Sequence, residues 1–281
     1  MDYKVSSKNI DHPLLKPILE ELIPVLEKKK IKFYIIGAVA RDILMEISGE
    51  TPGRRTMDLD IAIAIDKWEE FQELSEGITA LENFSKDDKQ QQRFLYKNTF
   101  QLDVVPYGKI KDEHDKIFWP PDHSFAMSIL GFDEAENSLL HIRLDEDLSF
   151  EVVSLNGIFL LKLFAWKDRF SRTNKDADDM GFILNSYFHI HRDISFKEPY
   201  NKVYELEEFT EIKAGAIILG MQLNELLYTN TSTRDKVKTL LQEEIAKEEE
   251  SKLINQIIET NRNLKFDDVK DALHLINIQI K

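Results

Sequence analysis

The chain has 281 residues, 42% of them hydrophobic and 31% charged, which is enough for one large folded domain or two modest ones. It contains no cysteine, which excludes disulfides and cysteine-based metal sites and is typical of a reducing compartment. Its formal net charge of −14 at pH 7 argues against loose binding of nucleic acid over a broad surface, because such binding depends on cations that neutralise phosphates.

The amino terminus is polar from Met1 to Asn9 and lacks the apolar segment of a secretory signal. Nowhere does an apolar run reach the roughly 20 residues that are needed to span a bilayer. We therefore expect a cytoplasmic protein with no membrane partner.

Predicted helices and strands alternate in the first part of the chain. The periodicity of apolar residues predicts helices over His12–Lys30, Ala38–Ile47 and Trp68–Leu74, and strands over Phe33–Ile36 and Met57–Ile65. Gly37 ends the first strand and opens the second helix, and a polar loop over Gly49–Thr56 precedes the second strand.

Four more strands are predicted downstream. Runs of β-branched, aromatic and other apolar residues favour strands over Arg93–Tyr96, Phe100–Val105, Leu139–Leu144 and Phe150–Ser154. Lys97-Asn98-Thr99 separates the first two as a hairpin turn, Pro106 and Gly108 are expected to end the second, and Pro120-Pro121 marks a break. This order of elements predicts a small mixed sheet with helices packed against it.

The last part of the chain is predicted to be helical. Gly157–Phe170 is apolar on all sides, which suggests a buried helix. Further helices are predicted over Lys202–Leu227, Ser232–Asn261 and Phe266–Ile278, with N-caps at Thr231-Ser232-Thr233 and Asp267. The fold class is therefore expected to be α+β, with an α/β domain over residues 1–154 and a helical domain over residues 155–281.

Two carboxylates lie two positions apart in the predicted strand that follows the polar loop. Alternate side chains of a strand point to one face, so Asp58 and Asp60 point the same way, separated by about 6–7 Å. Two carboxylates at this spacing can bind one or two divalent cations, while burying them without partners in a core would be costly.

Asp103 is the candidate for a third carboxylate. It lies in a predicted strand that could pair beside the strand of Asp58 and Asp60, which would place three acids around one metal site. Phosphoryl transfer uses such a site, because metal ions bridge the phosphates and help an attacking hydroxyl lose its proton. The alternative is that Asp103 only faces solvent on an amphipathic strand; the presence of Asp58 and Asp60 favours the metal site.

The glycine turn before the second helix is a candidate phosphate site. The helix that follows Gly37 has free N–H groups at its start, and such groups bind phosphate oxygens. Arg41, one turn further on, could contact the substrate or could pair with Asp42 or with the edge of the sheet.

A second set of charged residues lies in the predicted buried helix. Lys162 and Arg169 are seven residues apart and therefore share one helical face. A lysine in so apolar a helix must reach a cavity or an anion, so Lys162 is a candidate contact to a triphosphate. The alternative is a salt-bridged helix surface, with i,i+4 pairs between Arg172 and Asp176 and between Lys175 and Asp179.

These residues together resemble the nucleotidyltransferase superfamily, whose pattern is a glycine turn, an Asp-x-Asp strand and a later aspartate. The resemblance extends to the AbiEii/AbiGii-type branch over roughly residues 30–190, and it rests on the segments Gly37–Asp42, Arg55–Asp60, Leu102–Pro106, Lys162–Arg169 and Lys175–Asp179. It implies a polymerase-β-like core followed by a helical domain, and the use of Mg²⁺ and a nucleoside triphosphate.

The resemblance also implies roles for these residues. Asp58 and Asp60 would be metal ligands, Asp103 would be the third acid, which activates the acceptor hydroxyl, and Lys162 would hold phosphates, with Arg169 on the same face. The turn departs from the pattern, because the family usually has glycine or serine where this chain has Ala38. Alanine keeps the backbone contact but removes a hydroxyl.

The leading hypothesis is a magnesium-dependent enzyme that moves a nucleoside monophosphate from a nucleoside triphosphate to an acceptor hydroxyl. Members of the branch are often toxins with an antitoxin partner or act in phage defence, and some modify tRNA ends. The negative charge of the chain would instead suit a cationic acceptor, as in an aminoglycoside-type nucleotidyltransferase. Ala38 and the acidic surface leave a third hypothesis, a binding module for nucleotides or partners without turnover.

Overall fold

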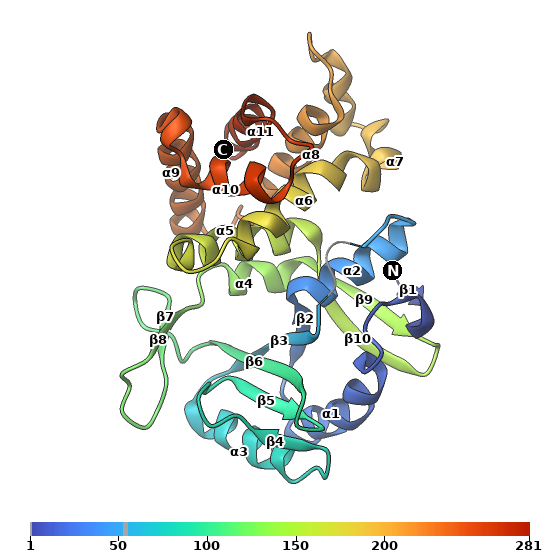
Figure 1. The fold of residues 1–281 in the computed structure, drawn as a ribbon, viewed down its shortest axis with the longest axis vertical. Helices are drawn as coiled ribbons and strands as arrows, with labels where there is room; N and C mark the ends of the chain where they lie inside the picture. Colours follow the sequence, from blue (N-terminus) through green and yellow to red (C-terminus); the bar gives the residue numbers. More distant parts are fainter. Residues whose placement is uncertain (1, 53–55) are drawn as a thin grey trace. The chain divides into compact units, whose positions relative to one another are not determined.

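The computed structural model describes residues 2–52 and 56–281, so Met1 and positions 53–55 of the predicted polar loop lie outside the described residues. The chain divides into two compact units, Met1–Ser154 and Leu155–Lys281 (Figure 1). The first unit contains the β-strands, and the second consists of helices.

The first unit is built on a mixed sheet. Among the described residues its strands follow the order β1-β9-β10-β2-β3-β6-β5-β4. Their bounds are β1 Asp2–Val5, β2 Phe33–Ile36, β3 Asp58–Ile65, β4 Phe84–Lys86, β5 Arg93–Tyr96, β6 Phe100–Gly108, β9 Leu139–Leu144 and β10 Leu148–Val153. At the centre, β3 runs antiparallel to β2 and parallel to β6. A separate pair, β7 Lys116–Phe118 and β8 Ala126–Ser128, forms a short hairpin.

One face of this sheet forms the core of the unit. Leu59 of β3 and Leu102 of β6 are fully buried, and each lies between two less buried neighbours, as expected for strands with one covered face. Helix α3 (Trp68–Thr79) lies on this face, because the Lys86 Nζ sits over the rings of both Phe71 in α3 and Phe94 in β5. Helix α1 (Leu15–Lys29) packs against α3 and buries its leucine-rich side.

The opposite face is covered only in part. The Tyr34 hydroxyl of β2 donates to the Phe132 carbonyl of the short helix α4 (Phe132–Ala135) at 3.0 Å, and the Tyr107 ring of β6 contacts Phe132. Helix α2 (Gly37–Ser48) leaves the end of β2 directly and packs against β1, β2 and β3. This face remains accessible at the start of β3.

The second unit is a set of packed helices. They are α5 Leu155–Arg169, α6 Lys175–Ile190, α7 Arg192–Ser195, α8 Glu211–Leu226, α9 Thr231–Ala246, α10 Lys252–Thr260 and α11 Phe266–Gln279. Helix α8 packs against both α6 and α11, and its own residues from Ala214 to Gly220 are buried. The predicted α+β class, a mixed sheet followed by a helical region, is confirmed.

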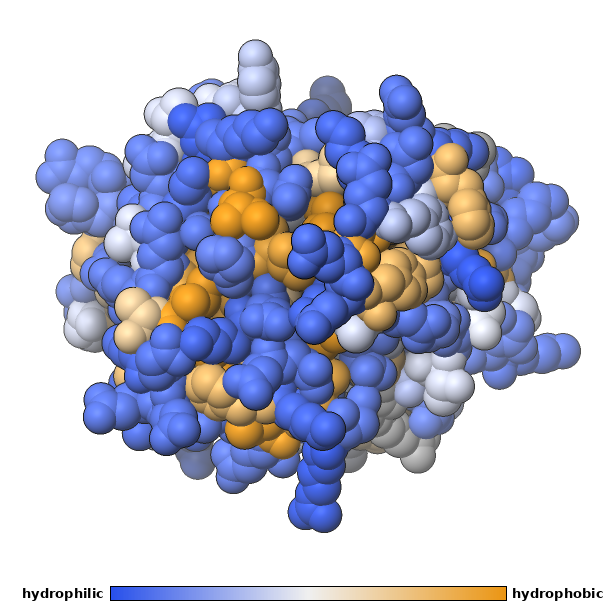
Figure 2. Space-filling view, turned by 90° about the horizontal axis from the view of Figure 1, so that it is seen from above, coloured by the Kyte–Doolittle hydropathy of each residue, from blue (hydrophilic) through white to orange (hydrophobic). Residues whose placement is uncertain are grey.

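The surface of the chain is mostly polar. Figure 2 shows hydrophilic residues over most of the face it draws, with hydrophobic residues in small scattered patches. Within the described ranges, none of the helices has the length and hydropathy that crossing a membrane requires.

Two predicted helices are wrong over part of their length. The helix predicted over Lys202–Leu227 is a 3-10 turn at Tyr200–Glu205 followed by α8, whose N-cap is Thr210. The helix predicted over Ser232–Asn261 is divided into α9 and α10. The predicted N-caps also differ, because Asn230 caps α9 by accepting from the Thr233 amide and Lys265 precedes α11.

The strand β6 is longer than predicted. It continues through Pro106 to Gly108, although Pro106 was expected to end it. Strand β5 pairs with β6 only up to Asp103, so Pro106 has β3 as a neighbour on one side and lies at a free edge on the other. Proline, which has no N–H, is tolerated at such an edge.

Candidate functional site

The register of β3 and β6 brings the predicted acids to one face of the sheet. Asp60 lies opposite Asp103 in the parallel pair, and Asp58 lies opposite Gln101. Neighbouring strands are about 4.8 Å apart, and residues in register point to the same face. All three acids are partly exposed, whereas Leu59 between them is fully buried. The predicted pairing of the Asp103 strand beside the Asp-x-Asp strand is confirmed.

The glycine turn lies directly against one of these acids. Ile36 of β2 is the antiparallel partner of Asp60, so the chain enters α2 beside Asp60. Gly37 has φ +71°, and a Cβ added there would lie 2.4 Å from the Asp60 Oδ2. Only glycine therefore leaves room for the carboxylate in this position. Ala38 follows, 6% exposed, within the first turn of α2.

Arg41 is buried and paired within its own helix. Its Nε and Nη2 donate to the Asp42 Oδ1 at 3.0 and 2.8 Å, and the arginine is 1% exposed. The structure thus contains the pair with Asp42 that the sequence left open, and the pair lies one turn from Gly37. A contact from Arg41 to a nucleotide stays a prediction.

Asp103 has a partner that the sequence analysis missed. Arg93 of β5 lies opposite Asp103, and its Nε and Nη2 donate to the two carboxylate oxygens at 2.7 and 2.8 Å. These hydrogen bonds raise the pKa of Arg93. The predicted hairpin turn could have revealed this partner, because a hairpin that pairs Tyr96 with Phe100 also places Arg93 opposite Asp103.

Asp58 also has a hydrogen-bond partner. The Thr56 hydroxyl, which is buried, donates to the Asp58 Oδ1. Asp58 therefore has a fixed neighbour at the end of the polar loop, while Asp60 lies against Gly37.

The donor chemistry of this face fits a divalent cation. Asp58, Asp60 and Asp103 are carboxylates on adjacent parallel strands, which are the ligands that Mg²⁺ prefers. In the part of the chain that the structure describes, no three His, Asp or Glu side chains are close enough to hold a metal ion together. Both oxygens of Asp103 accept hydrogen bonds from Arg93 instead.

Lys162 and Arg169 belong to an ion-pair cluster inside the second unit. The Lys162 Nζ lies 3.2 Å from Asp176 and 2.6 Å from Asp179, and Arg169 donates to both oxygens of Asp176 at 2.6 and 2.7 Å. Burial would raise the pKa of Asp176, but Arg169 and Lys162 outweigh it and lower this pKa. The pairs form between α5 and α6.

The alternative interpretation, a salt-bridged helix surface, is wrong in its partners. Asp176 pairs with Arg169 and Lys162, and Asp179 with Lys162, instead of the i,i+4 pairs with Arg172 and Lys175. The anion that a buried Lys162 requires is supplied by carboxylates of its own unit. Binding of phosphate by Lys162 or Arg169 stays a prediction.

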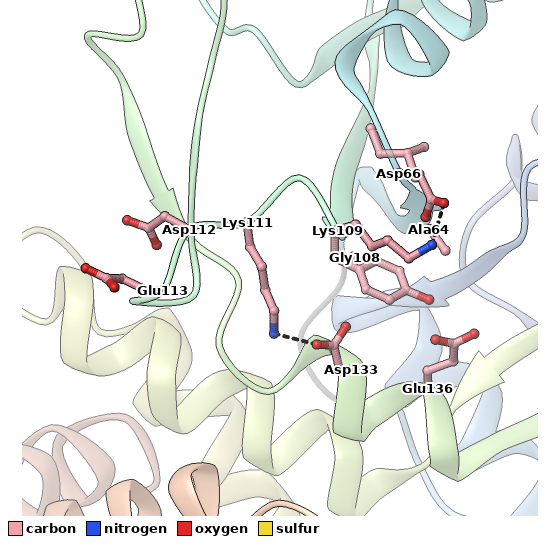
Figure 3. A pocket seen from close by; sticks show the side chains of 11 residues that line it. Ala64, Asp66, Gly108, Lys109, Lys111, Asp112, Glu113, Asp133 and Glu136 are labelled. Carbon is pink, nitrogen blue, oxygen red and sulfur yellow. Dashed lines mark hydrogen bonds and ion pairs between the residues drawn. The ribbon is translucent and has the colours of Figure 1, made fainter.

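A hollow of about 610 Å³ lies at the other end of β3 and β6 (Figure 3). Its lining comes from the end of β3 and β6, from the loop after β6, and from α4 and the 3-10 turn that follows it. The residues are Ala64, Ile65, Asp66, Tyr107, Gly108, Lys109, Lys111, Asp112, Glu113, Asp133 and Glu136. Lys111 points to Asp133, at 2.6 Å. Ala64 is four residues along β3 from Asp60, about 13 Å, so the hollow is separate from the three acids.

No protein-family model matches the chain, and no curated protein matches it. Several solved structures show a distant likeness to it. The crystal structure of ANT(2'')-Ia in complex with adenylyl-2''-tobramycin is 11% identical with a TM-score of 0.37, over 63% of this chain and 88% of that chain.

Two other solved structures give similar values. An antigenic nucleotidyltransferase-like protein from Paracoccidioides brasiliensis is 17% identical with a TM-score of 0.40, over 80% of this chain and 93% of that chain. The CdnE cyclic dinucleotide synthase of Elizabethkingia meningoseptica, with GTP and Apcpp, is 11% identical with a TM-score of 0.30, over 98% of this chain and 93% of that chain.

Proposed function

We propose that the chain is a metal-dependent nucleotidyltransferase that transfers a nucleoside monophosphate from a nucleoside triphosphate to an acceptor hydroxyl. The observation that carries the proposal is that the glycine turn lies beside the acids. Gly37 lies against Asp60, and Asp60 lies in register with Asp103. A phosphate-binding helix start and two carboxylates on one open face are what this chemistry needs.

Each group has a task in this reaction. The free N–H groups at the start of α2, from Gly37 and Ala38 onward, bind phosphate oxygens. Asp58 and Asp60, with Asp103, would hold Mg²⁺, which supplies charge neutralisation at the phosphates when it is bound. Arg41, Lys162 and Arg169 are proposed as further cations for the nucleotide.

The transfer forms one bond to phosphorus and breaks another. The acceptor hydroxyl oxygen forms a bond to the α-phosphorus, and the bond from that phosphorus to the bridging oxygen breaks, so that pyrophosphate leaves. Asp103 is placed beside Asp60 to take the proton of the hydroxyl. The division into an α/β nucleotidyltransferase domain over residues 1–154 and a helical domain over residues 155–281 is part of the proposal.

Two acceptors are supported by different observations. The motif resemblance to the AbiEii/AbiGii-type branch favours a tRNA end, and with it a toxin that a cognate antitoxin restrains. The net charge of −14 favours a cationic small molecule such as an aminoglycoside, because an acidic protein attracts cations.

The proposal is tested with purified protein, Mg²⁺ and α-labelled nucleoside triphosphates, offered tRNA, protein and aminoglycosides in parallel. We expect label on one acceptor class and its loss by a factor of about 10³ or more in Asp60→Asn, since the metal-bound phosphates would lose a ligand. Asp66→Asn is the matched control, because Asp66 follows the same strand about 20 Å away and is exposed. Nucleotide binding without transfer would favour the binding module instead. A protein that neither binds nucleotide nor transfers it would refute the proposal.

A further inference from the structure

The pair between Arg93 and Asp103 lies on the open face that carries the acids. Its side chains are 23% and 13% exposed, and both oxygens of Asp103 accept from the guanidinium. Asp58 adds to the negative field around Arg93. Arg93 therefore provides a cation bound directly to Asp103 on this acidic face.

The hairpin does not depend on this pair. Strands β5 and β6 are joined along four register pairs, from Tyr96 and Phe100 to Arg93 and Asp103, and the turn residues Lys97 and Asn98 have the positive φ of a tight hairpin. A bidentate pair of arginine and carboxylate can add to the stability of such a hairpin. The guanidinium is also placed to serve a second role.

Asp103 cannot serve Arg93 and a divalent cation equally well. A cation bound near Asp60 would lie within one strand spacing of Asp103 and would repel the guanidinium from it. A planar guanidinium released there has a matching partner in a phosphate group, which accepts the same two parallel hydrogen bonds as a carboxylate.

We propose that Arg93 is a transferable counter-cation, which holds Asp103 when the site has neither metal nor nucleotide and moves to the nucleotide phosphates when Asp103 turns to the metal. This inference rests on the proposed function. It makes metal and nucleotide bind cooperatively. A metal that binds Asp103 releases Arg93 for the phosphates, and phosphates that bind Arg93 release Asp103 for the metal. Without nucleotide, Arg93 weakens metal binding; with nucleotide, it strengthens the binding of phosphate.

The experiment uses the full-length protein and the variant Arg93→Met, which removes the charge but keeps an unbranched side chain. Binding of Mn²⁺ alone is measured by electron paramagnetic resonance, and binding of ATP and of GTP with Mg²⁺ by calorimetry. We expect Mn²⁺ alone to bind about tenfold more tightly to Arg93→Met than to the wild type, and the nucleotide that binds to do so about tenfold more weakly.

Two controls define the effect. Arg143→Met removes an arginine of the same sheet whose pair with Asp2 is exposed, and it should change neither affinity. In an Asp103→Asn background, Arg93→Met should no longer tighten Mn²⁺ binding, because the competition is for that carboxylate. Arg93→Lys keeps the positive charge but lacks the two parallel N–H groups of the guanidinium. Its Mn²⁺ affinity should be closer to that of the wild type than the affinity of Arg93→Met is, and its nucleotide affinity should be lower than that of the wild type.

The outcomes separate this inference from the proposed function. If Mn²⁺ binding depends on Asp60 but does not tighten in Arg93→Met, Arg93 is a structural tie and only the counter-cation idea fails. If neither the wild type nor Arg93→Met binds Mn²⁺ or nucleotide, both ideas fail together.

Discussion

At the scale of single residues, the glycines that begin and follow α2 allow a matched comparison. Gly37 and Gly49 both have φ +71°, but a Cβ on Gly37 would meet Asp60, whereas a Cβ on Gly49 would meet nothing within 4 Å. An alanine at either position must adopt the left-handed conformation, which costs roughly 1–2 kcal/mol. The two substitutions therefore share a backbone cost and differ only at the carboxylate.

We expect Gly37→Ala and Gly49→Ala to lower the free energy of unfolding by similar amounts in urea titrations. Only Gly37→Ala should also weaken Mn²⁺ binding, by about 10- to 100-fold, because it displaces a proposed ligand. Equal Mn²⁺ affinity in the two variants would show that the position of Asp60 beside Gly37 has no bearing on metal binding.

At the scale of elements, the break between α9 and α10 depends on one buried carboxylate. Glu244 of α9 is 2% exposed and accepts from the Ser251 hydroxyl at 2.9 Å, from the Leu253 amide at 3.1 Å and from the Lys247 Nζ at 2.5 Å. Burial would raise the pKa of Glu244, but these hydrogen bonds outweigh it and lower this pKa. The carboxylate satisfies the free N–H of Leu253 in the first turn of α10.

Glu244→Gln should therefore lower the free energy of unfolding at pH 7 by about 1–3 kcal/mol, because a charged acceptor is lost. Since the folded-state pKa of Glu244 is depressed, its contribution is present above the usual glutamate pKa and is lost as the pH falls through the folded-state value. Urea unfolding between about pH 6 and pH 3 should show the wild type and the variant converging. Glu243→Gln, which changes an exposed neighbour, should match the wild type throughout.

The same elements show what a sequence can predict. Strand Phe33–Ile36 and strand Leu139–Leu144 were predicted with the bounds they have, because their apolar runs are short and end at clear turn or loop residues. The break at residues 247–251 was missed, because helical periodicity continues across it and only the tertiary contacts of Glu244 favour it. Strand Asp2–Val5 was missed because only Val5 of it is buried, so no pattern marks a strand held by its main chain.

In the candidate site too, features set by local sequence patterns were predictable and features set by tertiary packing were not. The approach of Asp60 to Asp103 was predictable, since both lie in clear β-rich runs. The pairs of Lys162 and Arg169 with Asp176 were not, because they depend on how α5 and α6 pack, and spacing along one helix favours i,i+4 partners.

At the scale of the whole molecule, each unit has its own core, and the second contains a convenient probe. Trp166 of α5 is 1% exposed and donates to the Gln256 side chain at 2.8 Å, and it is the single tryptophan of residues 155–281. Gln256 and the Phe170 ring, whose centroid lies 5.2 Å from that of Trp166, both belong to the second unit.

We expect a protein of residues 155–281 alone to be helical and to show blue-shifted Trp166 emission that shifts to the red in one cooperative urea transition. A shorter protein of residues 175–281, which lacks α5 and so leaves α6 uncovered, should lose cooperative unfolding by circular dichroism. A gradual, non-cooperative transition in the longer protein would contradict an independently folding helical domain.

The order of strands in the sheet has a consequence for the growing chain. The strands that carry or flank the acids, β2 to β6, are contiguous in sequence and adjacent in the sheet, so they can assemble as soon as residue 108 has left the ribosome. Strand β1 precedes these strands in the sequence, but it pairs with β9, and Asp2 must wait for His141. Closing so long a loop is slow compared with local pairing. Strand β1 is thus synthesised before the strands of the acidic face and joins the sheet after them.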